Sequence, residues 1–141
     1  MRLFLTEFAF EKSKIEDKVR DVQFEIIFHL IKILLYPKSS PYIHWKIELK
    51  AWLDKISFMK SKNGNYLKAK NYLSIMYDEP IGNDLDVLKR IVETITEDYK
   101  GWKIRDISLK ELNNQIHNII SVIANDFEKG TYRFSEIERY L

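Results

Sequence analysis

The feature that most constrains this chain is a series of apolar stripes, in which hydrophobic side chains recur every three or four residues. The clearest stripe lies between residues 42 and 59, where the steps alternate between three and four. Its members are Tyr42, Trp45, Leu49, Trp52, Ile56 and Met59. This spacing places all six side chains on one face of an α-helix, which has about 3.6 residues per turn. A half-buried β-strand would instead require strict alternation of apolar and polar residues, so the stripe predicts a helix.

Capping and breaking residues indicate where the helices begin and end. Ser13 and Glu16 have the spacing of a capping box, and the stripe that follows ends at Pro37, which disfavours helix at the preceding residue. Ser40 and Pro41 then open the helix that carries the clearest stripe. The expected helices cover residues 14–35, 41–61, 66–77, 84–100 and 109–128, and Ser135 would start one more turn. Extra apolar residues near residue 35 predict that this end of the first helix is the most buried.

Three further signals delimit the helices of the C-terminal half. Ser108 and Glu111 form a second capping box. Gly101 and Gly130 follow apolar stripes, and glycine favours the left-handed conformation with which many helices end.

These segments predict an all-α protein, an antiparallel bundle of about five amphipathic helices. Glycine and proline are scarce, at 4 and 3 residues, which argues against a loop-rich β fold. The length of 141 residues is typical of a single domain, so we expect one helical domain over residues 1–141. Residues 1–12 would form an N-terminal arm, for which both helix and extended structure remain open.

The clearest stripe also predicts part of the core. We expect Trp45, Leu49, Trp52 and Ile56 to be buried against the helices of residues 14–35 and 109–128.

Residues that would carry catalysis are scarce. The chain has no cysteine, and therefore no thiolate nucleophile and no disulfide, and it has no glycine-rich phosphate loop. His29, His44 and His117 each lack a second histidine or an acidic cluster at the spacing of metal ligands. We expect His29 to have a partly buried structural role. The sequence therefore predicts a non-enzymatic protein with no catalytic residue, metal or cofactor.

Charge is distributed unevenly along the chain. The totals nearly balance, with 23 Lys and Arg against 21 Asp and Glu, but seven acidic residues fall within residues 78–98. The expected helix of residues 84–100 carries Asp84, Asp86, Glu93, Glu97 and Asp98. An acidic helix face can bind a basic surface of another protein, as a neutralising protein of the immunity or antitoxin type would. We therefore expect a protein-binding module with these five residues as its contact.

A second interpretation is binding to RNA or single-stranded DNA. Residues 46–70 hold seven lysines, interleaved with aromatic residues, and such a combination can contact phosphates and stack on bases. The candidate contacts are Lys60, Lys62, Lys68 and Lys70. Against this interpretation, Trp45 and Trp52 belong to the apolar stripe and are expected in the core.

The sequence also predicts the surroundings of the protein. The longest apolar run, residues 26–36, contains His29 and Lys32 and is shorter than the roughly 20 residues that span a bilayer. Glu7 and Glu11 interrupt the apolar start that a secretory signal would need. We expect a cytoplasmic protein without a membrane partner, and its oligomeric state is left open.

Overall fold

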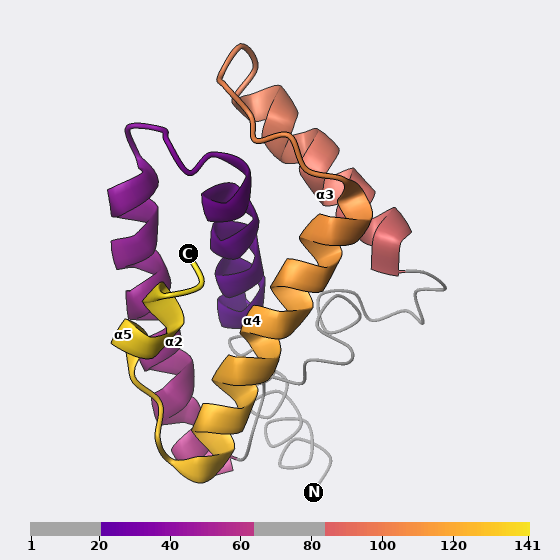
Figure 1. Cartoon of the computed structure of the whole chain (residues 1–141). Helices are drawn as coiled ribbons and strands as arrows, with labels where there is room; N and C mark the ends of the chain where they lie inside the picture. The colour runs from indigo at the N-terminus through magenta and orange to yellow at the C-terminus, as the bar shows by residue number, and fades with distance from the viewer. Residues whose placement is uncertain (1–20, 64–83) are drawn as a thin grey trace, which may run out of the picture.

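A computed structural model of the chain describes residues 21–63 and 84–141, and every regular element in these two ranges is an α-helix (Figure 1). The elements are the helix of residues 21–35, α2 (Tyr42–Asn63), α3 (Asp84–Asp98), α4 (Leu109–Lys129) and the short α5 (Phe134–Glu138). The all-α prediction is confirmed. The expected helix of residues 66–77, the first capping box and the N-terminal arm lie outside the described residues.

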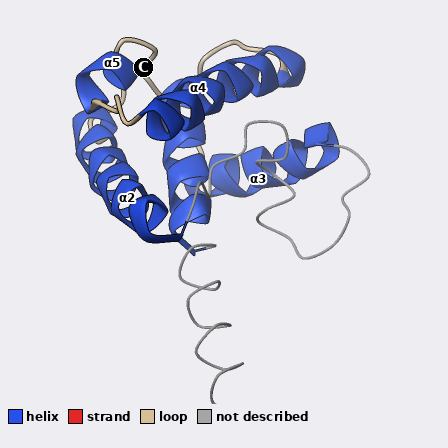
Figure 2. Ribbon diagram, turned by 90° about the horizontal axis from the view of Figure 1, so that it is seen from below, coloured by secondary structure: helices blue, strands red, loops and turns tan. Residues whose placement is uncertain are grey.

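The helix of residues 21–35 occupies the middle of the molecule. It lies between α2 and α4 in Figure 1, and Figure 2 shows α3 on its remaining side. The consecutive residues Ile33, Leu34, Leu35 and Tyr36 are all buried. Leu30 and Ile31, one turn earlier, are buried as well, and Lys32 between these two groups is half-buried, so this end of the helix is almost completely covered. The predicted burial of this end is therefore confirmed.

A turn after residue 36 sends α2 back antiparallel to the 21–35 helix (Figure 1). The segment that follows α3 runs back along α3, and α4 then crosses α3 at a steep angle (Figure 1). α4 packs against both α3 and α5. The backbone N–H of Arg105, in the segment before α4, donates to the carbonyl of Leu35 over 2.8 Å. This hydrogen bond satisfies one of the carbonyls that a helix leaves unpaired at its C-terminal end.

The expected local signals at the helix ends are observed. The Ser108 side chain accepts a hydrogen bond from the backbone N–H of Glu111, which confirms the Ser108 half of the second capping box. Gly130 ends α4 with a φ of 70°, in the left-handed region. Gly101, in the turn after α3, has a φ of 89°. The last helix begins at Phe134 instead of Ser135, and Arg133 precedes it without a side-chain cap.

The predicted core of α2 needs one correction. Trp45, Leu49 and Ile56 are buried as expected, but Leu53 is fully buried in place of Trp52, which is half-buried at the edge of the core. The steps from residue 45 are therefore four, four and three, a pattern that follows the straight helix more closely than alternating steps do. The Nζ of Lys55 lies 5.3 Å from the centre of the Trp52 ring, on the solvent side of this edge.

The partners of Trp45 also differ in part from the prediction. Its ring lies 6.3 Å from that of Tyr36, which follows the 21–35 helix, and 5.5 Å from that of Tyr99, which follows α3. Tyr36 and Tyr99 each also contact Trp102, so four rings cluster at one end of the bundle. Trp45 thus packs against the residue that follows α3, a neighbour that the sequence did not predict.

The burial of Leu53 in the position expected for Trp52 leads to a stability prediction. Leu53→Ala should lower the free energy of unfolding by about 3 kcal/mol, because it leaves a cavity in a fully buried site. Trp52→Gln should cost only about 1 kcal/mol, since the amide can reach solvent at the edge of the core. Urea denaturation followed by far-UV circular dichroism measures both values. The reverse order of the two losses would place Trp52 in the core and contradict the observed register.

Candidate functional site

The side of α2 that points away from the bundle is unusually apolar. Ile43 and Ile47 are 67% and 62% exposed, and Phe58, three turns further on, is 63% exposed. Ala51 is exposed between them, so the four residues form a stripe at helical spacing, which the exposed Asp54 interrupts between Ala51 and Phe58. We call this stripe the outer face of α2. It lies opposite the buried stripe that contains Leu49, and α2 therefore has two apolar faces, of which the bundle covers one.

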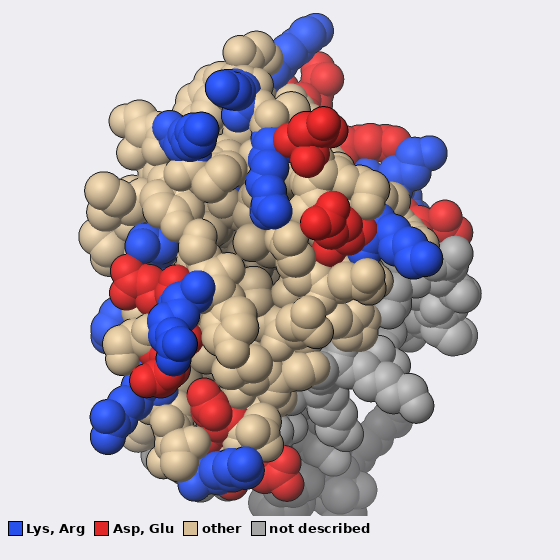
Figure 3. All heavy atoms as spheres, in the orientation of Figure 1, with Lys and Arg blue, Asp and Glu red and all other residues tan. Residues whose placement is uncertain are grey.

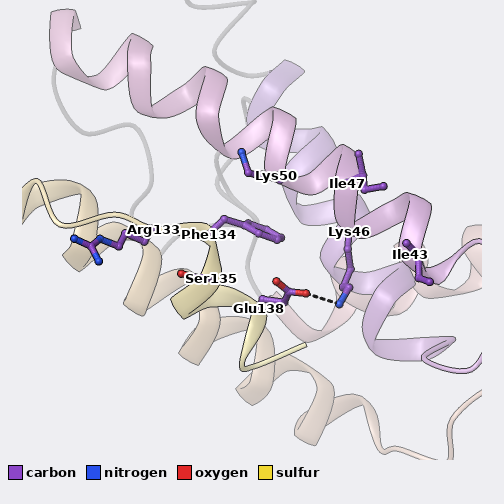
Figure 4. A pocket seen from close by; sticks show the side chains of 8 residues that line it. All are labelled: Ile43, Lys46, Ile47, Lys50, Arg133, Phe134, Ser135 and Glu138. Atoms are coloured by element: carbon purple, nitrogen blue, oxygen red, sulfur yellow. Dashed lines mark hydrogen bonds and ion pairs between the residues drawn. The ribbon is translucent and has the colours of Figure 1, made fainter.

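The outer face of α2 forms one wall of a groove whose other wall is the start of α5 (Figure 4). The groove has a volume of about 790 Å³. Its lining residues are Ile43, Lys46, Ile47, Lys50, Arg133, Phe134, Ser135 and Glu138. Figure 4 shows that the groove is elongated: Ile43 lies toward one end and Arg133 toward the other, with Phe134 projecting between them toward α2.

Contacts between α2 and the C-terminal segment hold the walls of this groove together. The Tyr42 hydroxyl donates to the backbone carbonyl of Leu141 over 2.7 Å, and the Tyr132 hydroxyl donates to Asp54 over 3.2 Å. Burial and the neighbouring carboxylate of Asp54 raise the pKa of Tyr132, so its hydroxyl remains a donor. Ile137 of α5 is fully buried in the core. The groove is therefore built into the folded chain, with both walls anchored.

The charges in the groove are unevenly paired. Lys46 Nζ donates to Glu138 Oε1 over 2.8 Å, and this hydrogen bond raises the pKa of Lys46. Lys50 pairs with Asp54 over 2.7 Å. Arg133 is exposed and forms no ion pair with any residue in ranges 21–63 and 84–141. The lining holds three cations and one anion, and its unpaired cation stands at the end of the groove.

Of the five acidic residues singled out in the sequence, α3 brings three together. Asp86, Glu93 and Glu97 are exposed, and on a helical wheel they fall within about 40° of one another. We call these three the acidic stripe. Within the described part of the chain they form no ion pair. Lys89 and Arg90 lie on either side of the same stripe, and Figure 3 accordingly shows acidic and basic groups interspersed over α3.

The two remaining acidic residues mark the ends of α3. Asp98 is exposed but lies about 100° or more around the helix from the acidic stripe. Asp84 is the first residue of the helix, and the structure does not describe its side chain.

The lysines of the nucleic-acid interpretation are placed only in part. Lys60 and Lys62 belong to the last turns of α2, where the structure describes the backbone and not these side chains. Lys68 and Lys70 lie outside the described residues. Of the aromatic residues among these lysines, Trp45 is buried and unavailable for base stacking.

Two histidines that are separate in the sequence meet at one carboxylate. Glu48 Oε2 lies 2.5 Å from Nε2 of His29, and Glu48 Oε1 lies 2.5 Å from Nε2 of His44. Nδ1 of the buried His29 lies 2.6 Å from the backbone carbonyl of Glu25. Both ring nitrogens of His29 thus lie within hydrogen-bond distance of an oxygen. The His29 side chain is accordingly buried, as expected, but it is not isolated from other titratable groups.

The pairing of Glu48 joins α2 to the 21–35 helix. The hydrogen bond from His29 is the largest influence on Glu48 and lowers the pKa of its carboxyl, with smaller contributions from His44 and Lys32. His44 is exposed and lies one turn before Glu48, so this second contact reinforces the ion pair from the solvent side. No group of three or more potential metal ligands is found among residues 21–63 and 84–141.

Comparison with known proteins returns no relative: no family model, curated protein or solved structure matches the chain. None of the helices in the described part of the chain is long and apolar enough to cross a bilayer.

The sequence interpretation did not single out the groove. Ile43, Ile47 and Phe58 follow a second helical stripe beside the one that was used to predict the core, and this stripe is visible in the sequence. Arg133 and Phe134 carry no such signal, because only the tertiary structure brings them to α2.

The ion pair of His29 and Glu48 leads to a pH-dependent prediction. Glu48→Gln should reduce the free energy of unfolding by about 1 kcal/mol at neutral pH, a modest value because the Glu48 side chain is 38% exposed and solvent screens it. Since the folded state lowers the pKa of Glu48, this stabilisation is complete above its ordinary pKa of 4.5 and is lost as the pH falls through the lower, folded value.

Urea denaturation of the wild type and of Glu48→Gln, from neutral pH down to about pH 3, tests this sign. The difference between the two proteins should shrink at the acidic end. Glu128→Gln, at an exposed position of α4, is the matched control. A difference that stays constant over the whole range would show that the Glu48 carboxylate does not carry the effect.

Proposed function

We propose that this chain is a non-enzymatic protein-binding module whose contact surface is the outer face of α2 and the groove beside it. The observation that carries the proposal is the exposure of Ile43 and Ile47, each by more than half, in a groove with anchored walls. A contiguous exposed apolar patch rimmed by polar residues is typical of a surface that another protein covers. Burying these side chains in a complex would remove apolar area from water and favour association.

The composition of the groove favours a protein over a nucleic acid as the partner. The α2 wall combines two isoleucines, Ile43 and Ile47, with two lysines, and Phe134 is the one aromatic ring of the groove lining. Single-stranded nucleic acids are bound mainly through cations and several stacking rings. Two of the three cations in the groove, Lys46 and Lys50, are already paired with carboxylates and would have to exchange these partners for phosphates.

The proposal predicts that polar residues on the outer face of α2 abolish binding without unfolding the chain. Tagged wild type and the double variant Ile43→Asp/Ile47→Asp are incubated with nuclease-treated extract of cells that produce the protein. The double variant should lose a specific protein partner by about tenfold or more in quantitative mass spectrometry, as expected when central apolar contacts are removed.

Ile104→Asp is the matched control, since Ile104 is an exposed isoleucine outside the groove. It should retain the partner. A partner that the double variant binds as well as the wild type does would contradict the proposed surface. Circular dichroism of each variant checks that the helical fold is intact.

The acidic stripe of α3 supports a second contact with a protein. Asp86, Glu93 and Glu97 are exposed and free of ion pairs within the described ranges, so a basic surface could pair with them. A neutralising protein of the immunity or antitoxin type is the more specific form of this proposal, and it would require a basic toxin as the partner.

Charge reversal of the acidic stripe tests this second contact. The triple variant Asp86→Lys/Glu93→Lys/Glu97→Lys should slow association with a captured partner about tenfold at low salt, because exposed charges act mainly on the association rate. Surface plasmon resonance at several salt concentrations measures the rate. An unchanged rate and salt dependence would exclude the stripe from the contact.

A further inference from the structure

We infer that the groove between α2 and α5 receives an amphipathic helix of a partner protein, with apolar residues on one face and acidic residues beside them. This inference rests on the proposed function and adds the chemistry of the partner. Three features of the groove lead to it: the spacing of its apolar residues, the arrangement of its charges and the anchoring of its walls.

The apolar residues of the groove have the spacing that a helix can match. Ile43 and Ile47 lie one helical turn apart on α2, and Phe134 faces them from the start of α5 (Figure 4). A helix that docks into an apolar groove presents its own apolar side chains at steps of three and four residues. Such side chains would cover the two isoleucines and contact the Phe134 ring, which leaves the polar side of the partner helix in water.

The charges of the groove select acidic residues on that helix. Glu138 is neutralised by Lys46, and Lys50 is paired with Asp54, so the groove lining keeps the unpaired guanidinium of Arg133. A carboxylate next to Arg133 would gain a charge-assisted hydrogen bond, in two-pronged geometry if the side chain approaches in the plane of the guanidinium. A lysine beside the guanidinium would instead meet the like charge of Arg133, although Asp126 and Glu136 line the neighbouring hollow that Arg133 also borders.

The length of the groove fixes where the acidic residue belongs. Arg133 and Ile43 lie toward opposite ends in Figure 4, so the carboxylate must follow the apolar residues along the partner helix and cannot stand between them. The walls are held by the Tyr42–Leu141 and Tyr132–Asp54 hydrogen bonds before any partner arrives. A preformed site needs little ordering on binding, which favours affinity.

Synthetic peptides of about 18 residues, long enough to form a helix, test this inference directly. One fluorescein-labelled peptide carries leucines at alternating steps of three and four, with glutamates beyond both ends of this leucine stripe, and the control peptide has lysine at every glutamate position. Fluorescence anisotropy measures the dissociation constant of each with the full chain. The acidic peptide should bind about tenfold more tightly than the basic one at low salt.

Variants of the groove identify where the acidic peptide binds. Arg133→Glu and Ile47→Asp should each weaken its binding by about tenfold, and Arg133→Glu should also improve binding of the basic peptide. Lys110→Glu and Ile104→Asp, at exposed positions outside the groove, are the matched controls and should leave both affinities unchanged.

The outcomes separate this inference from the proposed function. Equal binding of both peptides, or failure of both to bind, overturns the inference that the partner helix is acidic. Loss of the cellular partner in Ile43→Asp/Ile47→Asp would still support a protein-binding groove.

Two other occupants of the groove can be detected with the same variants. Binding of a single-stranded oligonucleotide that Arg133→Glu abolishes would instead assign the groove to nucleic acid. A dimer in sedimentation equilibrium that Ile47→Asp dissociates would assign it to a second copy of this chain. Both results overturn the inference.

Discussion

The almost complete burial of the C-terminal end of the 21–35 helix is the constraint on which the rest of the bundle depends. A helix with consecutive buried residues from Ile33 to Tyr36 is stable only when other elements cover each of its sides. α2, α3 and α4 provide these surfaces, and the segment before α4 pairs with the last carbonyls of the helix through Arg105. Burial also constrains the polar groups of this helix, because the ring nitrogens of the buried His29 need partners within the protein. Glu25 and Glu48 supply them, and the pair with Glu48 also sets the position of α2.

Covering the 21–35 helix requires only one face of α2, although α2 is apolar on two. The inner stripe, with Leu49 and Leu53, enters the core, and the outer face with Ile43 and Ile47 stays exposed beside α5. These isoleucines contribute little to the stability of the isolated chain, since most of their apolar area remains in water. Their arrangement beside an anchored second wall is what makes the outer face of α2 a better candidate contact than the acidic stripe of α3, which mixes with Lys89 and Arg90.

The uneven distribution of charge along the sequence is partly resolved by pairing within the fold. Lys46, from the lysine-rich stretch, pairs with Glu138 near the C-terminus, and Asp54 receives a hydrogen bond from Tyr132. Charges that are far apart in sequence therefore neutralise each other locally and fasten the C-terminal segment onto α2. Arg133 is the exception in the groove, and it comes from the half of the chain that is acidic by count. The charge of a surface thus cannot be inferred from the charge of the sequence segment that contributes to it.

The sequence by itself determined the features that depend on neighbouring residues. The all-α class, the Ser108 cap, the Gly130 end of α4 and the burial around residue 35 follow from interactions within one or two helical turns. Only the tertiary structure decided between neighbours with similar local preferences. The packing of the helices places Leu53 in the core and leaves Trp52 at its edge, whereas a stripe with steps of three and four can be drawn through either of these adjacent apolar residues. In the same way, Glu48 joins His29 across 19 residues, and the groove joins α2 to residues near the end of the chain. These contacts depend on how the helices pack, and the packing is set by long-range complementarity of shape and charge that no local pattern contains.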